Sequence, residues 1–186
     1  MSPGVIVIIS GPSGVGKDTI INAWKKSNAR VERVVTYTTR AARQGEKNGV
    51  DYHFVDERAF VDLAKAGAFL EHKMVHGNRY GTPMEGLAAI LSKNNIAVLK
   101  VDVQGALAAM PKLQGEVSIF LMPPSIEELT RRLRERKTES DTQIRTRIRN
   151  AKREMAAAVH YSAVVVNDDI DRAVAEIERI VAEHEG

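Results

Sequence analysis

Apolar residues recur along the chain in short runs separated by longer stretches of mixed character. Residues 5–9 are apolar at every position, which is typical of a strand buried on both faces of a parallel sheet. Similar runs follow at 96–101, 117–122 and 163–166. Helices are expected at 19–26 and at 170–181, the second with an apolar residue every three or four positions. This alternation predicts an α/β fold, a three-layer sandwich around a parallel core sheet.

Two stretches interrupt the alternation. Residues 36–82 are polar and rich in glycine and aromatic residues, which predicts a small inserted β-rich subdomain. Residues 125–161 resemble two charged helices with few large apolar residues, joined near 137–141, and we interpret them as a helical lid. The remaining segments, 1–35, 83–124 and 162–186, should form the core.

Composition narrows the functional classes. A chain of 186 residues has room for one α/β domain. Its formal charge of +3 is mild, and its basic residues are interleaved with acids, so a nucleic-acid partner is not expected. Cysteine is absent, which excludes disulfides and thiolate metal sites. With no long apolar run near the start, we expect a cytoplasmic protein without a membrane partner.

A glycine-rich segment follows the first predicted strand and precedes the first predicted helix. It supplies the Gly-x-x-x-x-Gly-Lys pattern of a phosphate-binding P-loop, made of Gly11, Pro12, Ser13, Gly14, Val15, Gly16 and Lys17. Its glycines allow the backbone N–H groups to surround a phosphate, and the helix dipole favours the negative charge. Lys17 would contact the β- and γ-phosphates of ATP. A glycine-rich turn with an exposed lysine is the alternative, and the strand–loop–helix order disfavours it.

The next position departs from the P-loop pattern. Asp18, followed by Thr19, stands where the pattern requires serine or threonine. A carboxylate beside phosphates is repulsive unless a cation offsets it. That cation is either Mg²⁺ or a nearby basic side chain, and the residues alone do not decide between them.

Further motifs identify a family. They occur in this order: Thr36–Arg43, Gly45–Phe54, Glu71, Gly77–Thr82, Asp102–Gly105, Pro123–Ser125 and Val166–Asp169. Together with the P-loop they resemble guanylate kinase over essentially the whole chain. The resemblance implies transfer of the γ-phosphate of ATP to GMP, giving ADP and GDP, with Mg²⁺. It also implies that 36–82 is the GMP-binding subdomain and 125–161 the lid.

The resemblance implies a set of GMP-binding residues: Thr36, Arg40, Arg43, Tyr52, Glu71, Tyr80, Gly81, Thr82 and Asp102. Their chemistry suits GMP, because guanidinium groups match phosphate oxygens and a carboxylate accepts from both N1–H and the 2-amino group of guanine. Adenine presents a lone pair at N1 instead. Without the family resemblance, the alternative interpretations would be favoured: Arg40 and Arg43 in a solvated turn, and Glu71 as an ordinary surface glutamate.

A second departure accompanies the first. The family usually has an acid two residues before Asp102, and this chain has Lys100. We predict that Asp18 and Lys100 form a charge-compensated pair beside the P-loop, on neighbouring strands of the sheet. Which residues bind Mg²⁺ is therefore undecided, and Asp18 and Asp102 are the candidates.

By the same resemblance, the catalytic residues are Lys17, Arg40, Arg132, Arg136 and Arg147. Asn167 resembles the residue beside the ATP adenine, and a turn-forming role is its alternative. ATP binding would thus involve residues 11–19 and Asn167. No general base is expected, because the attacking phosphate oxygen is already ionised.

Two other functions fit parts of the sequence. One is a related kinase acting on a sugar phosphate, for which Glu71, Thr36 and Thr82 would have no base to bind. The other is a non-catalytic binding module of the same fold, supported only by Asp18 and Lys100. Use of dGMP and the choice between monomer and homodimer stay open at this stage.

Overall fold

The computed structural model describes residues 4–75, 77–135 and 140–186. Its centre is a parallel sheet whose strands lie in the order β2 (Val31–Arg33), β7 (Ile96–Lys100), β1 (Val5–Ser10), β8 (Val117–Met122) and β9 (Ala163–Val166). Four of these are the expected strands, and the predicted α/β fold is confirmed. The short strand β2 was not predicted, because its three residues Val-Glu-Arg give no apolar run.

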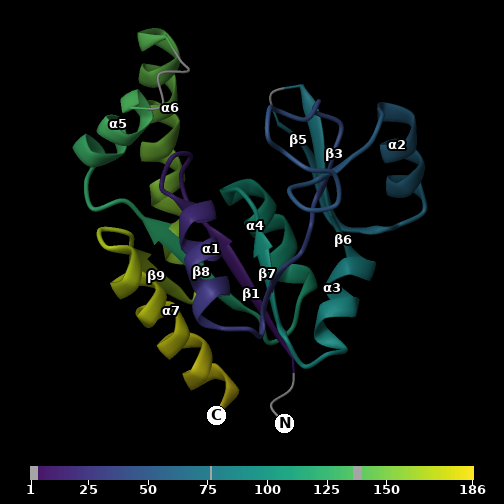
Figure 1. Ribbon diagram of the computed structural model, residues 1–186. Coiled ribbons are helices and arrows are strands. Elements are labelled where there is room, and N and C mark those ends of the chain that lie inside the picture. Colours follow the sequence, from purple (N-terminus) through teal and green to yellow (C-terminus); the bar gives the residue numbers. More distant parts are fainter. Residues whose placement is uncertain (1–3, 76, 136–139) are drawn as a thin grey trace.

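Helices cover both faces of this sheet (Figure 1). Helices α1 (Lys17–Ser27) and α7 (Ile170–Glu185) pack in one apolar cluster with the strands, and Trp24 lies fully buried between them. Helices α3 (Met84–Leu91) and α4 (Val103–Ala109) pack in a second cluster on the opposite face. The two layers keep the strands dry on both sides, as their uniform apolar character requires.

The register of the sheet brings the ends of neighbouring strands together. Ile9 lies opposite Lys100, and Ser10 lies opposite Phe120. Because these strands are parallel, the segments that follow them all leave the same edge of the sheet. The P-loop after β1 and the Lys100–Asp102 segment after β7 are therefore neighbours.

The segment expected to be β-rich forms a second, mixed sheet in the order β4 (His53–Phe54), β3 (Tyr37–Thr38), β6 (Asn78–Pro83) and β5 (Phe69–Val75). It also contains α2 (Glu57–Lys65), which the sequence reasoning did not anticipate. Asp56 caps this helix by accepting a hydrogen bond from the Ala59 N–H at 2.7 Å. Phe60 then stacks on Phe69 with ring centroids 4.7 Å apart, which fastens the helix to the sheet.

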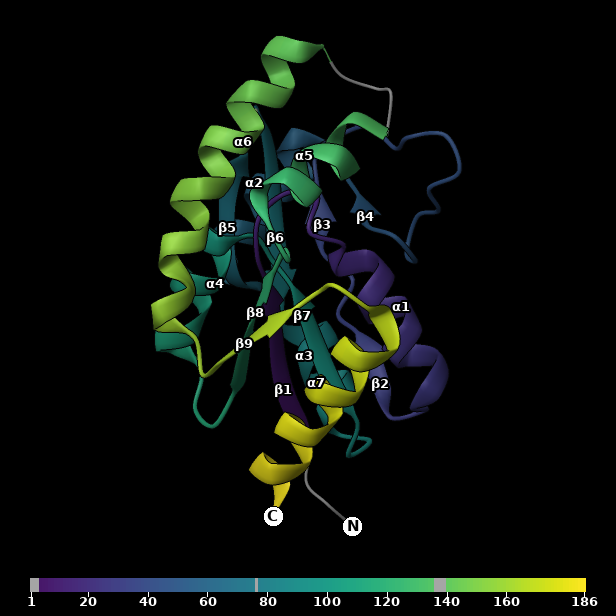
Figure 2. The ribbon, with the colours of Figure 1, turned by 90° about the vertical axis from the view of Figure 1, so that its left-hand side faces the viewer.

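The expected charged helices are α5 (Ile126–Glu135) and α6 (Asp141–Met155). Two short 3₁₀ helices, η1 (Met110–Lys112) and η2 (Ala156–His160), complete the described elements. Helices α5 and α6 lie side by side (Figure 2) and bury a small cluster of their own, made of Leu129, Leu133, Ile144 and Ala151. In Figure 1 these helices and the second sheet stand on opposite sides of the carboxyl edge of the core sheet. The exact limits of core, insertion and lid stay predictions.

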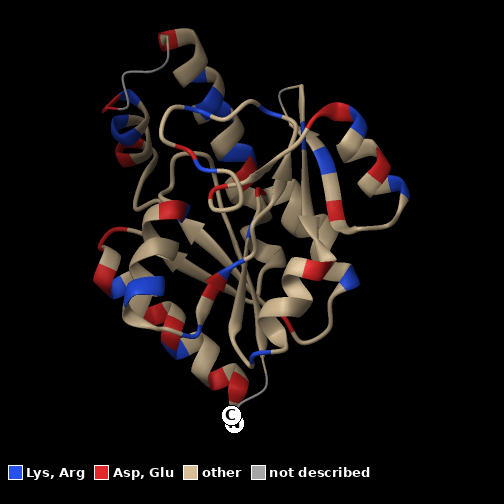
Figure 3. Cartoon of the chain, turned by 45° about the vertical axis from the view of Figure 1, so that its right-hand side comes forward, with Lys and Arg blue, Asp and Glu red and all other residues tan. Residues whose placement is uncertain are grey.

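Charged residues of both signs alternate along the helices, as Figure 3 shows. On α5, Arg131 pairs with Glu128 at 2.7 Å, one helical turn away. In the ranges that the structure describes, no helix is long and apolar enough to cross a membrane.

Candidate active site

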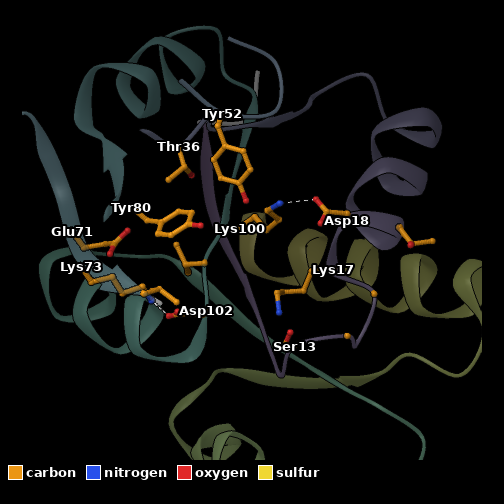
Figure 4. A pocket seen from close by; sticks show the side chains of 15 residues that line it. Ser13, Lys17, Asp18, Thr36, Tyr52, Glu71, Lys73, Tyr80, Lys100 and Asp102 are labelled. Carbon is orange, nitrogen blue, oxygen red and sulfur yellow. Dashed lines mark hydrogen bonds and ion pairs between the residues drawn. The ribbon is translucent and has the colours of Figure 1, made fainter. Parts of the chain in front are cut away.

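A cleft of about 310 Å³ opens at the carboxyl edge of the core sheet, between the P-loop and the second sheet. The P-loop side contributes Lys17, Asp18 and Thr19. The other walls come from the second sheet and its linkers and from the end of β7, with side chains of Thr36, Tyr52, Glu71, Lys73, Tyr80, Lys100 and Asp102 (Figure 4). Residues far apart in the sequence thus share one cavity, as expected at this edge of a parallel sheet.

Two P-loop glycines are required by the space around them. Gly11 has a φ of 142°, and a Cβ there would lie 2.3 Å from the Leu121 carbonyl oxygen. Gly16 has a φ of 100°, and a Cβ there would lie 2.6 Å from the amide nitrogen of Asn167. Any larger residue would displace backbone or a buried side chain, so the loop keeps its anion-binding shape only with glycine.

Lys17 lies along the loop that precedes it. Its ammonium group donates to the carbonyl oxygens of Gly11 at 2.6 Å and Pro12 at 3.1 Å. It therefore stands at the rim of the loop, on the side that faces the cleft (Figure 4). A phosphate held by the loop would offer this cation a charged acceptor in place of neutral carbonyls.

The back of the P-loop is held by two side chains from outside it. Asn167 is only 4% exposed, and its amide donates to the Val15 carbonyl oxygen at 2.7 Å. Arg132 donates to the same oxygen at 3.3 Å and to the Asn167 carbonyl oxygen at 3.0 Å. Neither side chain lines the cleft. The contact of Asn167 with the ATP adenine stays a prediction, whereas its amide has a structural role because it supports the P-loop.

Replacing Asn167 with alanine should lower the free energy of unfolding by about 2 kcal/mol, because it removes a buried hydrogen bond. The Michaelis constant for ATP should rise in parallel, because the loop loses its support. Chemical denaturation and steady-state kinetics measure the two effects. The matched control is Asn22→Ala on the exposed side of α1. Equal stability of the two variants would contradict this role.

The predicted contact between Asp18 and Lys100 is present. The Lys100 ammonium donates to Asp18 Oδ1 at 2.7 Å, and the Arg33 guanidinium lies 3.5 Å from the same oxygen. Lys100 also lies 5.4 Å from the centroid of the Tyr52 ring. The carboxylate in the P-loop is thus balanced by cations of the protein itself, at the point where the phosphates of a nucleotide would lie.

The effect of replacing Lys100 on activity should depend on whether Asp18 is present. Lys100→Asp alone should lower kcat/KM for ATP, because it leaves two carboxylates beside the phosphates. In the Asp18→Ser background the same substitution should cost less, with a coupling of about 1–2 kcal/mol, close to a tenfold difference. A double-mutant cycle on kcat/KM measures it. If Lys100→Asp costs the same in both backgrounds, the two positions are not coupled.

The wall opposite the P-loop carries a buried carboxylate. Glu71 is 4% exposed, and its Oε1 accepts a hydrogen bond from the Thr82 hydroxyl at 2.7 Å. Among the described residues, Oε2 has no hydrogen-bond partner. Gly81, next to Thr82, packs so closely on Phe60 and Phe69 that a Cβ would lie 3.0 Å or less from their rings. Glu71 is therefore a fixed acceptor directed into the cleft.

The two expected phosphate-binding arginines differ in position. Arg40 lies 5.4 Å from the centroid of the Tyr52 ring and donates to Glu46 at 2.8 Å. This hydrogen bond raises the pKa of Arg40 and is also the main reason that the pKa of Glu46 is lowered. Arg43 is exposed and does not line the cleft. Arg40 is likewise absent from the cleft lining, and both arginines lie close enough to Glu46 to lower its pKa. Their convergence on one phosphate stays a prediction.

Comparison with known proteins agrees with this arrangement. A sequence model described as guanylate kinase matches residues 4–184. The chain belongs to the guanylate kinase family. Guanylate kinase from Alcanivorax borkumensis is 44% identical over 178 residues, which cover 96% of this chain and 86% of that protein. Guanylate kinase from Caldanaerobacter subterraneus is 41% identical with the same coverage.

A solved guanylate kinase has the same fold. The crystal structure of guanylate kinase from Anaplasma phagocytophilum superposes with a TM-score of 0.81 at 37% sequence identity. The match covers 99% of this chain and 87% of that one. The family resemblance inferred from the sequence motifs is therefore confirmed.

Both helices of the predicted lid, α5 and α6, contact the P-loop. Arg147 of α6 lies 3.4 Å from the Ser13 hydroxyl, beside a second cavity of about 570 Å³. Arg132 of α5 contacts the back of the loop, and Leu133 would lie 2.7 Å from a Cβ at Gly14. The predicted catalytic residue Arg136 lies outside the described residues.

One cleft residue was missed by the sequence reasoning. Lys73 projects from β5 and pairs with the carboxylate of Asp102 (Figure 4). It stands two positions after Glu71, and alternate residues of a strand point to the same face. That spacing was a usable signal for placing the lysine beside the glutamate.

Two carboxylates of the cleft are paired with lysines. Over the residues that the structure describes, no three His, Asp or Glu side chains come together as metal ligands. Asp18 is paired with Lys100, and Asp102 with Lys73. A Mg²⁺ ion that keeps most of its waters and is bound through ATP phosphates fits such a site better than one held by the protein alone.

Proposed function

We propose that this member of the guanylate kinase family transfers the γ-phosphate of ATP to GMP, giving ADP and GDP. The observation that carries the proposal is that Lys17 of the P-loop and the buried carboxylate of Glu71 line the same cleft. A phosphate-binding loop at one end and an acceptor for purine N–H groups at the other suit two nucleotides placed phosphate to phosphate.

The chemistry of Glu71 favours guanine over adenine. Its carboxylate accepts from N1–H and the 2-amino group, while Thr82 holds one of its oxygens. Adenine would direct its N1 lone pair at the same carboxylate and leave a buried charge without a donor. A mismatch of this kind is worth on the order of 10⁴-fold in discrimination. Thr36 lines the same cleft and is assigned to the base with them.

The GMP phosphate is assigned to Arg40, Arg43, Tyr52 and Tyr80. Tyr52 and Tyr80 line the cleft, and their rings lie 6.0 Å apart. Arg40 would exchange Glu46 for the phosphate, since a dianion competes well with one carboxylate for a guanidinium fork. Arg43 would have to approach when the nucleotide binds, because it is exposed.

Transfer needs positioning and charge neutralisation more than proton transfer. The GMP phosphate oxygen is ionised near neutral pH, so no general base is assigned. Lys17 follows the charge on the migrating phosphoryl group, and the lid arginines Arg132, Arg136 and Arg147 are proposed to add to it. Mg²⁺ bound with ATP supplies further charge neutralisation at the β- and γ-phosphates. Lid closure excludes water and suppresses hydrolysis.

We place the reaction in the cytoplasm, with ATP and GMP as partners and dGMP as a further acceptor to be assayed. A sugar-phosphate kinase and a non-catalytic binding module are the competing functions. A sugar-phosphate kinase would have no base for the buried Glu71 to bind. A non-catalytic module would not need the P-loop Lys17, so neither function accounts for the whole cleft.

The test is an ADP-production assay with ATP and, in turn, GMP, dGMP, AMP and ribose 5-phosphate, with and without Mg²⁺. Turnover should be fastest with GMP and should depend on Mg²⁺. Faster turnover of ribose 5-phosphate than of GMP would support the sugar-phosphate kinase. The complete absence of turnover would support the binding module and overturn the proposal.

A further inference from the structure

Three charged groups meet around Gly105, and we call Glu71, Lys73, Asp102 and Gly105 the nucleobase corner. A Cβ at Gly105 would lie 2.8 Å from the Lys73 ammonium nitrogen and 3.3 Å from Glu71 Oε2. The absence of a side chain at Gly105 therefore leaves room for both groups. A cation lies within the corner, between two carboxylates.

Asp102 makes two interactions in this arrangement, a hydrogen bond and an ion pair. Its Oδ1 accepts the Gly105 N–H at 2.8 Å, which caps α4, and it forms the ion pair with Lys73. Glu71 Oε2, in contrast, is buried without a hydrogen-bond partner among the described residues. The acceptor that awaits a substrate N–H is thus Glu71, whereas Asp102 already has its counter-ion.

Lys73 remains a cation under ordinary assay conditions. Burial lowers its pKa to about 8, while the carboxylates of Glu71 and Glu154 act in the opposite direction. The ion pair with Asp102 also favours the protonated form. Near pH 7 Lys73 therefore contributes a positive charge to the nucleobase corner.

This charge balance changes what the corner demands of a purine. The family resemblance implies that Asp102 lies near the 2-amino group of guanine. If Asp102 had no cation, a base without that group would leave this partly buried carboxylate with the Gly105 N–H but no counter-ion, which is unfavourable. With Lys73 in place, Asp102 stays paired whether or not the base carries the amino group. Guanine and hypoxanthine both keep the N1–H that Glu71 accepts, and they differ only at position 2. When the 2-amino group is missing, Glu71 Oε1 still accepts from the Thr82 hydroxyl, so neither carboxylate oxygen is left without a donor.

We propose that Lys73 is a specificity-determining residue that makes the nucleobase corner accept 6-oxopurine nucleoside monophosphates with or without a 2-amino group, so that IMP is phosphorylated as well as GMP. The inference rests on the proposed function, since it concerns the acceptor of the same reaction. Its scope is limited to the 2-position, because adenine still lacks the N–H that Glu71 requires.

The test compares kcat/KM for GMP and IMP in the parent protein, in Lys73→Met and in Lys73→Arg. Methionine keeps the length of the side chain and removes the charge. The GMP-to-IMP ratio should rise about tenfold in Lys73→Met, the scale of one hydrogen bond to a charged group. It should stay near the parent value in Lys73→Arg and in the matched control Lys65→Met, which removes an exposed lysine from α2.

An unchanged or smaller ratio in Lys73→Met would overturn the inference, because a purely structural role lowers both activities together. If that variant does not fold, competition binding of GMP and IMP to the parent protein decides. IMP affinity within about thirtyfold of GMP supports the role of Lys73, and weaker binding overturns it. Absence of GMP turnover by the parent protein would refute the proposed function, whereas strict use of GMP would refute only this inference.

Discussion

Glu71→Gln is expected to lower kcat/KM for GMP by on the order of 10⁴-fold, the largest effect of any single substitution in the cleft. The amide can still accept from Thr82, which holds the side chain in place at 2.7 Å in the parent protein. Its NH₂ group, however, would face N1–H or the 2-amino group of guanine, donor against donor. Steady-state kinetics with GMP at saturating ATP measure the loss.

The control for this variant is Glu85→Gln, an exposed glutamate at the start of α3. It should retain parent activity and parent stability. Turnover of AMP, which we expect to be slow in the parent protein, provides a second reference, because the Glu71 substitution should narrow the gap between GMP and AMP. Retention of most GMP activity by Glu71→Gln would show that guanine is recognised elsewhere.

Lys17→Met should lower kcat by about 10³-fold, because a cation that follows the transferring phosphoryl group is lost. The KM for GMP should change little, since Lys17 lies on the P-loop side of the cleft, away from Glu71. Single-turnover measurements separate the chemical step from product release.

Lys26→Met, on the exposed last turn of the same helix, is the matched control and should leave kcat unchanged. Far-UV circular dichroism and a thermal melt confirm that both variants fold. If Lys17→Met raises the KM for GMP as strongly as it lowers kcat, the loss would arise from general disruption of the cleft.

The core sheet was predictable because its strands are uniformly apolar. The runs at 96–101 and 117–122 correspond to β7 and β8, which are buried on both faces. Helix α2 was missed although Phe60, Leu63 and Ala64 recur at helical spacing, because the polar, glycine-rich character of the surrounding stretch favoured a β-rich interpretation of all of 36–82. The helix is nine residues long, so its periodic signal was short beside the polar, glycine-rich residues around it.

For the site, the pairing of Asp18 with Lys100 was predictable because two unusual residues carried opposite charges beside adjacent strands. The positions of Arg40 and Arg43 beside Glu46 were not, since the path of the linker after β3 decides where these guanidinium groups lie. Lys73 was overlooked because no motif contained it. The two-residue repeat of a strand places Lys73 on the same face as Glu71. This repeat becomes informative only once β5 is known to face the cleft.

The support behind the P-loop has a thermodynamic consequence for ATP. Asn167 and Arg132 both donate to the Val15 carbonyl oxygen, so the loop is ordered by contacts that belong to the fold. The conformational entropy of arranging these residues is lost when the chain folds, and it does not have to be lost again when the nucleotide arrives. Binding of the triphosphate to this preorganised loop therefore retains more of the energy of its new hydrogen bonds as affinity.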